Sequence, residues 1–250
     1  MIKLFKKTIE AFGYKILDKK LFKNQRLVSQ NSILTISNFL KKKFDEKEIN
    51  SLIQIGANDG LRFDDLNYFI KKYKVKSVLV EPIEEYFSNL KINYQSYDNI
   101  FFENSAITVD EKDKFLFSVS QKYIHLYDDH IPGINSFEIK HLIKHGVKKK
   151  HIIKKQINSL NISELINKYK FDNLDLLFID AEGYDVNIVN DFLINLNLRP
   201  IIIFEYIHSD TKKLASLMEL LKEKKYIYFT INENILCIPI EKKTITLSTY

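Results

Sequence analysis

Short apolar runs alternate with segments of helical spacing from residue 51 to residue 240. The apolar runs predict strands, and runs such as 174–180 and 200–206 are apolar at nearly every position. That continuous pattern is typical of a parallel sheet covered by helices on both faces. The eight predicted strands are 51–55, 77–81, 100–107, 114–119, 174–180, 200–206, 225–231 and 235–240.

Helices are predicted between these strands, where apolar residues recur every three to four positions. The last two strands are joined by a short turn at 232–234, which predicts an antiparallel hairpin at one edge of the sheet. We therefore expect an α/β fold with a mostly parallel, Rossmann-like sheet and a C-terminal antiparallel hairpin. The predicted helices are 62–74, 84–95, 162–169, 185–196 and 211–224.

Residues 1–48 carry a different pattern, in which apolar positions such as Ile36 and Leu40 follow helical spacing and lysines occupy the other face. This pattern predicts an N-terminal helical cap on a second domain, residues 49–250. An irregular stretch of that domain, at about 120–158, holds five of the six histidines. Long segments of this kind are usually lids or binding loops, so we expect a lid-like insert.

Composition narrows the class of protein. A single cysteine excludes an internal disulfide, and no apolar run is long enough to cross a bilayer, so we expect a cytoplasmic protein. The net charge of +6 collects in lysine runs such as 41–43 and 148–150. These runs fit a solvated face, and the basic N-terminus also fits peripheral contact with an anionic membrane. No nucleic-acid partner is expected, because no arginine-rich or aromatic-interleaved motif accompanies the lysines.

The first predicted strand runs into a glycine turn, Gly56–Gly60, before the first helix begins. Glycine permits a tight bend and the close approach of a ligand to the backbone. The next strand ends at Glu81, followed by Pro82, and a carboxylate there can accept both hydroxyl hydrogens of a ribose. The turn lacks the third glycine of a dinucleotide fingerprint and the Gly-Lys-Ser/Thr of a P-loop. The pair predicts an adenosine-bearing cofactor, with a purely structural turn as the alternative.

Four segments resemble the FkbM family of S-adenosylmethionine-dependent methyltransferases, in the family's order: SLIQIGANDG, VLVEPIEEYFSNL, LDLLFIDAEGYDVNIV and RPIIIFEYIH. The insert segment GINSFEIKHLIKHG resembles the branch of that family that carries QIGANDG. The resemblance implies a class I methyltransferase fold, with the cofactor over the glycine turn, its ribose on Glu81 and its adenine at the end of the third strand. The residues implied to bind the cofactor are Gln54, Gly56, Ala57, Asn58, Asp59, Gly60, Glu81, Pro82, Asn104, Ser105, Ala106 and Asp180.

One position departs from the family pattern. Most such enzymes have an acid two residues before the first glycine, where this chain has Gln54. A neutral amide can still accept a hydrogen bond from the methionine ammonium, but without charge assistance. We expect Asp59 to supply the missing negative charge.

Acids end the two later parallel strands and are predicted to meet, because the carboxyl ends of parallel strands open toward one crevice. Methyl transfer to a hydroxyl requires a base, and the unperturbed pKa of histidine, about 6.5, suits that role. We expect His208 to be the base, oriented by Glu205 or Asp180, with a plain surface or capping histidine as the alternative. Together with Glu182, these side chains also fit a divalent cation such as magnesium, although no metal is the expected cofactor.

Four further residues are candidates for substrate contact. Ser136, His141 and His145 belong to the insert, where plain surface positions are the alternative. His141 and His145 stand four apart on one helix face, which alone does not indicate zinc. Asp185 fits either substrate contact or the N-cap of the following helix.

The expected function is O-methylation of a hydroxyl on a sugar, in a glycan or a nucleotide-linked saccharide. The preference for a hydroxyl comes from the family resemblance. Three alternatives stay open: methylation of a polyketide or other small natural product, a non-catalytic cofactor-binding subunit, and an RNA methyltransferase suggested by the lysine runs. The last is disfavoured, because the aromatic stacking platform typical of RNA binding is missing.

Overall fold

The computed structural model describes residues 35–62, 64–109, 115–128 and 131–242. The chain divides into two compact units, Met1–Phe39 and Leu40–Tyr250. Most of the predicted N-terminal cap, residues 1–34, lies outside the described residues, and the remainder forms α3 (Ile36–Asp45). The predicted domain boundary after residue 48 stays a prediction. No helix in the described ranges has the length and apolarity that a membrane crossing needs.

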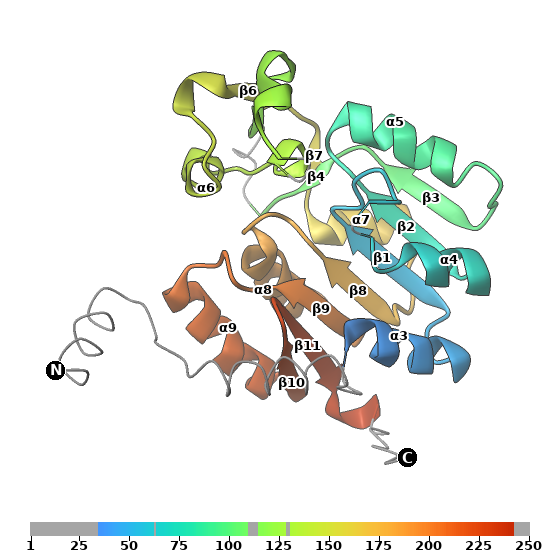
Figure 1. Cartoon of the computed structure of the whole chain (residues 1–250). Helices are drawn as coiled ribbons and strands as arrows, with labels where there is room; N and C mark the ends of the chain where they lie inside the picture. The colour runs from blue at the N-terminus through green and yellow to red at the C-terminus, as the bar shows by residue number, and fades with distance from the viewer. Residues whose placement is uncertain (1–34, 63, 110–114, 129–130, 243–250) are drawn as a thin grey trace, which may run out of the picture. The chain divides into compact units, whose positions relative to one another are not determined.

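A seven-stranded sheet forms the centre of the second unit, in the order β10-β11-β9-β8-β1-β2-β3 (Figure 1). Neighbouring strands are parallel except for β11, which runs antiparallel to both β9 and β10. The mostly parallel sheet and its C-terminal hairpin are thus confirmed. The strands are β1 (Ser51–Ile55), β2 (Lys76–Val80), β3 (Ile100–Glu103), β8 (Leu176–Ile179), β9 (Ile201–Glu205), β10 (Tyr226–Ile231) and β11 (Asn234–Pro239).

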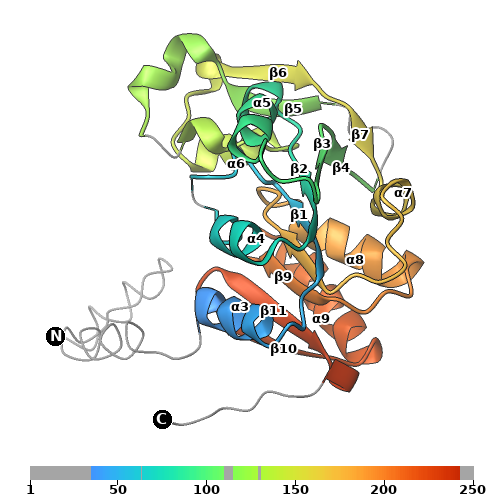
Figure 2. The same cartoon turned by 90° about the vertical axis from the view of Figure 1, so that its right-hand side faces the viewer.

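Helices cover both faces of this sheet, which explains why its central strands are mostly apolar. Figure 2 shows α4 (Asn67–Tyr73) and α5 (Glu84–Asn93) on one face. On the other face lie α7 (Ile162–Lys168), α8 (Asp185–Asn195) and α9 (Thr211–Glu223). Every residue of β8 is buried, as two covered faces require.

The predicted strand 100–107 is two strands, because the chain leaves the sheet at Asn104 and Ser105. The Ser105 hydroxyl donates to the Glu103 carboxylate at 2.8 Å, and β4 (Ala106–Ile107) then pairs with β7 (Ser159–Leu160) in a separate small sheet. This local side-chain bond takes the place of a continued ladder.

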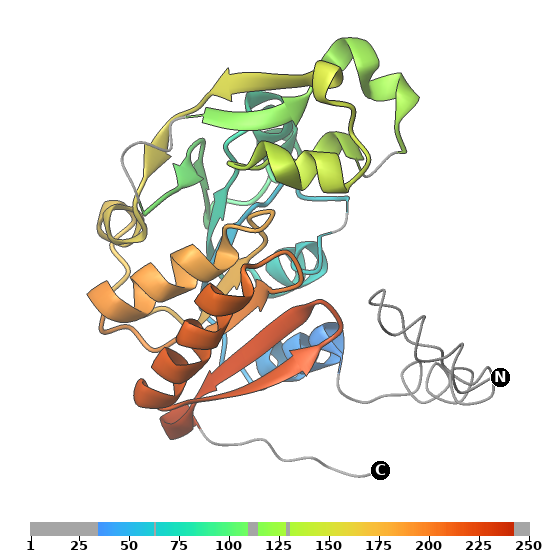
Figure 3. The ribbon, with the colours of Figure 1, turned by 90° about the vertical axis from the view of Figure 1, so that its left-hand side faces the viewer.

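The insert between β4 and β7 lies over the carboxyl ends of the parallel strands (Figures 1 and 3). Its strands β5 (Phe115–Val119) and β6 (Ile152–Gln156) pair antiparallel, away from the main sheet. Between them come four short helical segments: η1 (Gln121–Leu126), η2 (Ile131–Gly133), α6 (Ile139–Lys144) and η3 (Lys149–His151). A small apolar core of its own holds the insert together, formed by Val119, Ile131, Ile134, Leu142 and Val147.

Candidate active site

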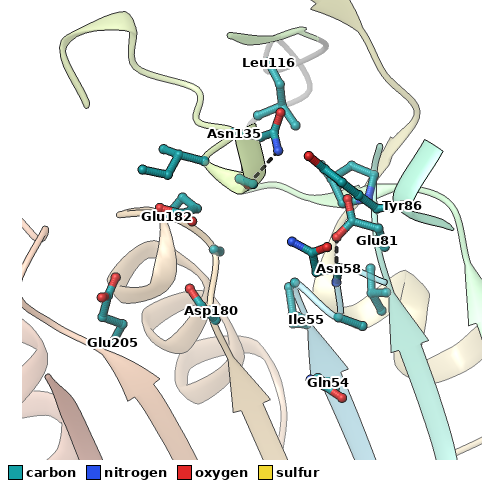
Figure 4. Close-up of a pocket in the computed structure, with 18 of the residues that line it drawn as sticks. Gln54, Ile55, Asn58, Glu81, Tyr86, Leu116, Asn135, Asp180, Glu182 and Glu205 are labelled. Atoms are coloured by element: carbon teal, nitrogen blue, oxygen red, sulfur yellow. Dashed lines mark hydrogen bonds between the residues drawn. The ribbon is translucent and has the colours of Figure 1, made fainter. Parts of the chain in front are cut away.

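A cavity of about 790 Å³ opens at the carboxyl ends of β1, β2, β8 and β9, beneath the insert (Figure 4). Ligand pockets in proteins typically measure about 300–1,000 Å³, so this volume suffices for a cofactor and part of an acceptor. In Figure 4, Glu81 and Tyr86 lie on one side of the cavity, and Asp180, Glu182 and Glu205 lie on the other. Glu81 and the acids that follow β8 and β9, which were predicted separately from the sequence, therefore face one space.

Packing within the protein is one reason why Gly56 and Gly60 must be glycines. Gly56 has a φ of +83°, and a Cβ at this position would lie 1.8 Å from the backbone oxygen of Asp180. A Cβ on Gly60 would lie 2.6 Å from side-chain atoms of both Leu90 and Tyr94. The sequence analysis expected the space beside these glycines to admit a ligand. This is corrected, because protein atoms lie where their Cβ atoms would be. Gly56, with Ala57 and Asn58, still lines the cavity, whereas Gly60 does not.

The Glu81 carboxylate is held at the cavity wall by backbone groups on both sides of it. Its Oε2 accepts from the Asn58 N–H at 3.0 Å, and its Oε1 accepts from the Ile83 N–H at 2.8 Å. The glycine turn therefore faces the acid one strand away. Burial raises the pKa of Glu81 to about 7, and the charges of Asp180 and Glu182 add to the rise. Each carboxylate oxygen keeps a lone pair for a ligand hydroxyl.

At the first strand, Gln54 is paired with an acid that the sequence does not single out. Its Nε2 donates to Asp64 Oδ1 at 3.0 Å, and both residues line the cavity. Gln54 Oε1 is buried and has no hydrogen-bond partner among the described residues. Such orphaned buried acceptors are rare in folded proteins, and a ligand donor would satisfy this one. An acceptor beside a carboxylate suits the ammonium of S-adenosylmethionine.

The expected role of Asp59 is corrected by its position. Its Oδ1 accepts from the backbone N–H groups of Leu61 and Arg62, both at 2.9 Å, so the carboxylate closes its own turn. Asp59 does not line the cavity. Asn104 also lies outside the lining, where its side chain donates to the Glu81 carbonyl at 3.0 Å.

Five other implied cofactor residues do line the cavity: Ala57, Pro82, Ser105, Ala106 and Asp180. Ser105 and Ala106 stand at the start of the insert, on the same side as Glu81. This wall is where the family resemblance puts the adenine.

Four groups expected to carry the chemistry converge on the opposite side of the cavity: Asp180, Glu182, Glu205 and His208. Asp180 is open to the cavity but enclosed by its walls, so desolvation, reinforced by the charge of Glu182, raises its pKa to about 7. Burial, with the charge of Asp180 next, raises the pKa of Glu205 to about 8. His208 Nε2 lies 3.9 Å from Glu205 Oε1. Burial lowers the pKa of His208, which favours the neutral, proton-accepting form.

Two candidates for substrate contact have structural roles instead. Asp185 is fully buried, and its two carboxylate oxygens accept from the N–H groups of Ala181 and Gly183, each at 3.2 Å. Ser136 is also buried, and its hydroxyl donates to the Glu182 carbonyl at 3.1 Å. Substrate contact at these positions is corrected accordingly, because neither side chain reaches the cavity. Both shape the loop after β8.

Three histidines gather at the edge of the cavity. His141 is buried and contacts Glu182 Oε2 through its Nε2 at 3.1 Å, whereas His145 lines the cavity with His208. Their ring centroids lie 4.6–4.9 Å apart. The sequence groups His208 with three acids as ligands for a cation. In the part of the chain that the structure describes, the group within reach of one ion is instead His141, His145 and His208.

Several lining residues have no sequence signal that would have identified them: Tyr86, Asn135, Phe137 and Glu233. Tyr86 lies on α5, and Asn135 and Phe137 lie in the irregular part of the insert. Glu233 sits in the turn of the hairpin, and its carbonyl accepts from the Tyr206 N–H at 3.0 Å. Only the predicted antiparallel pairing could have indicated that this turn returns to the end of β9.

The comparison with protein families identifies a methyltransferase. The sequence matches the model of the methyltransferase FkbM domain over residues 54–228. No protein of curated function matches it significantly.

Solved structures also resemble this chain, all at low sequence identity. Methyltransferase FkbM from Methylobacillus flagellatus KT shares 12% identity, with 76% of this chain and 43% of that chain covered and a TM-score of 0.43. An S-adenosylmethionine-dependent O-methyltransferase from Thermotoga maritima shares 13% identity, with 87% and 72% covered and a TM-score of 0.41. A ribosomal protein L11 methylase from Lactobacillus delbrueckii subsp. bulgaricus shares 12%, with 85% and 73% covered and a TM-score of 0.35.

This chain spans less than half of the Methylobacillus protein. The family match nevertheless covers more than half of this chain and includes the end of the first strand, the glycine turn, Glu81 and the acids after β8 and β9. The protein belongs to the FkbM family of S-adenosylmethionine-dependent methyltransferases, with the α/β sheet of the class I fold.

Proposed function

We propose that this protein transfers a methyl group from S-adenosylmethionine to a hydroxyl of a sugar, in a glycan or a nucleotide-linked saccharide. The observation that carries the proposal is that one cavity has a buried acid beside the glycine turn on one wall and a histidine beside a carboxyl group on the opposite wall. Glu81 belongs to the first wall, and His208 with Glu205 belongs to the second.

The first wall has the groups needed to hold the cofactor. Gln54 Oε1 and the Asp64 carboxylate would accept from the methionine ammonium, and Glu81 would accept from the ribose hydroxyls. Ser105 and Ala106 would border the adenine. When bound, S-adenosylmethionine supplies an electrophilic methyl group on a sulfonium cation. A cavity lined by several carboxyl groups favours a cation over a neutral or anionic ligand.

The second wall would orient the acceptor and take its proton. The acceptor oxygen forms a bond to the methyl carbon while the carbon–sulfur bond breaks and its electron pair stays on sulfur. The hydroxyl proton moves to the neutral imidazole of His208, and Glu205 at 3.9 Å, in its ionised form, stabilises the imidazolium that results. Placing the hydroxyl in line with the methyl carbon accounts for much of the rate enhancement in such transfers.

The lining of the cavity supports a sugar more than a phosphate-bearing group at the reacting centre. Arg62 is the only lysine or arginine among the described lining residues, whereas carboxyl groups recur around the cavity. Carboxylates and amides such as that of Asn135 accept and donate to neighbouring hydroxyls. Phe137 adds an aromatic surface of the kind that packs on the apolar face of a sugar ring.

The test uses the full chain with methyl-labelled S-adenosylmethionine and a panel of glycans, nucleotide sugars and hydroxylated natural products. We expect label on a sugar hydroxyl, and we expect His208→Gln to lower kcat by about 100-fold or more while S-adenosylhomocysteine still binds. His125→Gln is the matched control, because His125 also lines the cavity but lies outside the histidine group. Label only on non-sugar natural products would refute the sugar acceptor, and an unchanged kcat in His208→Gln would refute the base.

A further inference from the structure

The three histidines come from two parts of the chain that are remote in sequence. His141 lies on α6, His145 caps the end of that helix, and His208 follows β9. One nitrogen from each ring lies within 4.8 Å of the others. Helical spacing puts the first two on one face of α6, and the insert carries that face to the end of β9.

This grouping matches a first coordination shell. Around a four-coordinate zinc ion, histidine nitrogens lie about 2.1 Å from the metal and so about 3.4 Å from each other. In the structure these nitrogens lie within 4.8 Å of one another, and rotation of the side chains can bring them to the shorter distance that an ion requires. His145 and His208 border the cavity, which gives an ion its path to the site.

Two carboxyl groups complete the environment of a metal centre. Glu182 Oε2 lies 3.1 Å from His141 Nε2, so one ring nitrogen can donate to the carboxylate while the other binds an ion. Metal-bound histidines commonly donate to a carboxylate in this way, which fixes the orientation of the ring. Glu205 stands 3.9 Å from His208 on the side of the cavity.

The ligand set also selects the class of ion. Magnesium and calcium take oxygen ligands, whereas three imidazoles favour zinc and its first-row neighbours. Three protein ligands leave a fourth position of a tetrahedral ion for water or substrate, as in catalytic zinc sites.

We propose that His141, His145 and His208 bind one divalent transition-metal ion, zinc by preference, at the acceptor end of the cavity. A fourth position on the ion would be open to the cavity, where the acceptor hydroxyl would lie. With the ion bound, His208 would be a ligand, and the ionised carboxylate of Glu205 would take the hydroxyl proton in place of the imidazole. The part of the ion in catalysis rests on the proposed sugar O-methylation, whereas its binding does not.

The experiment measures binding without an acceptor. Untagged full-length protein is stripped with a chelator, dialysed against zinc in the presence of a competing chelator, and analysed for metal per chain. We expect one zinc per chain in the native protein and an affinity at least about 100-fold lower in His145→Ala and His208→Ala. His125→Ala should bind zinc like the native protein, because His125 lies outside the group.

Cobalt gives a second readout, since a tetrahedral cobalt centre with nitrogen ligands absorbs visible light. That absorption should appear in the native protein and be absent in His145→Asn, a milder change at a half-buried position. Retained binding of S-adenosylhomocysteine shows that each variant is folded.

Two results would overturn the metal site: no stoichiometric zinc in the native protein, or equal loss of zinc in His125→Ala. Zinc binding without any sugar methylation would instead leave the site standing and count against the proposed function. The two failures are therefore distinguishable.

Discussion

The carboxyl groups of the cavity make a specific prediction about pH and cofactor charge. S-adenosylmethionine and S-adenosylhomocysteine share the adenosine and the amino acid part, and only the former carries a sulfonium charge. Raising the pH from 6 to 9 ionises carboxyl groups whose pKa values lie near 7 to 8, as those of Glu81, Asp180 and Glu205 do. We expect the affinity for the sulfonium ligand to rise relative to that for its neutral product.

The size of the effect follows from these pKa values. A carboxyl group with a pKa of about 7 is about one tenth ionised at pH 6 and almost fully ionised at pH 9. If attraction to one ionised group decides the preference, the ratio of the two dissociation constants changes by up to about tenfold over this range. The ligand carboxylate is ionised in both ligands throughout this range and cancels in the ratio. Asp180→Asn removes one contributor and should flatten the curve.

Isothermal titration calorimetry of both ligands at four pH values and constant ionic strength gives the ratio directly. Asp191→Asn is the matched control, because burial also raises the pKa of Asp191 but this residue lies on α8, outside the cavity. A ratio constant to within about twofold from pH 6 to pH 9, with both ligands bound, would refute the idea that ionising cavity acids hold the sulfonium.

Two further predictions concern folding. Gly56→Ala should lower the free energy of unfolding by about 3 kcal/mol or more, because the backbone there is left-handed and the new Cβ would overlap the Asp180 carbonyl. Gly146 has a similar φ but open space around it, so Gly146→Ala should lower the free energy of unfolding by only about 1 kcal/mol. Equal losses of the two variants in chemical denaturation would contradict this prediction. The pKa of buried Asp185 is raised to about 7, so its protonated form favours the fold at low pH and this stability is lost as the pH rises through 7. The stability lost in Asp185→Asn relative to the native protein should therefore be larger at pH 5 than at pH 8, by about 2.5 kcal/mol, and parallel stability curves would count against the buried acid.

Much of the central fold could be predicted because its physical cause is local in the sequence. The strands 174–180 and 200–206 are apolar at nearly every position because helices cover both faces, and the observed strands β8 and β9 lie inside those ranges. The antiparallel hairpin was readable from its short turn. The continuous apolar pattern of the other strands predicted that they run mostly parallel.

The boundaries that differ have side-chain causes. The helix predicted from residue 62 begins at Asn67, because Asp64 accepts the N–H groups of Leu66 and Asn67 and shapes the preceding turn. The strand β6 was missed, since Lys154 and Lys155 give it a polar, mostly exposed pattern without a buried face. Its identity as a strand depends on pairing with β5, which no local pattern reveals.

The site divides in the same way. The glycine turn and Glu81 directly follow two strands that pair in parallel, so the sequence could predict that they lie close together. The sequence could not show that Asp64, and not Asp59, lies beside Gln54, because this depends on the directions in which the two side chains point within one loop. The meeting of His141 with His208 depends on how the insert folds back over the sheet, and no spacing in the sequence encodes that return.

The pairing of β4 with β7 has a consequence for how this enzyme could diversify. Ala106 stands opposite Ser159, so the chain departs and comes back within a single strand spacing, about 4.8 Å. The insert thus begins and ends at this short pair of strands. A different segment could be grafted there, by evolution or by an engineer, without rethreading the sheet that grips the nucleoside. If the insert selects the acceptor, as proposed, acceptor choice could change through this two-residue pairing while the central sheet stays the same.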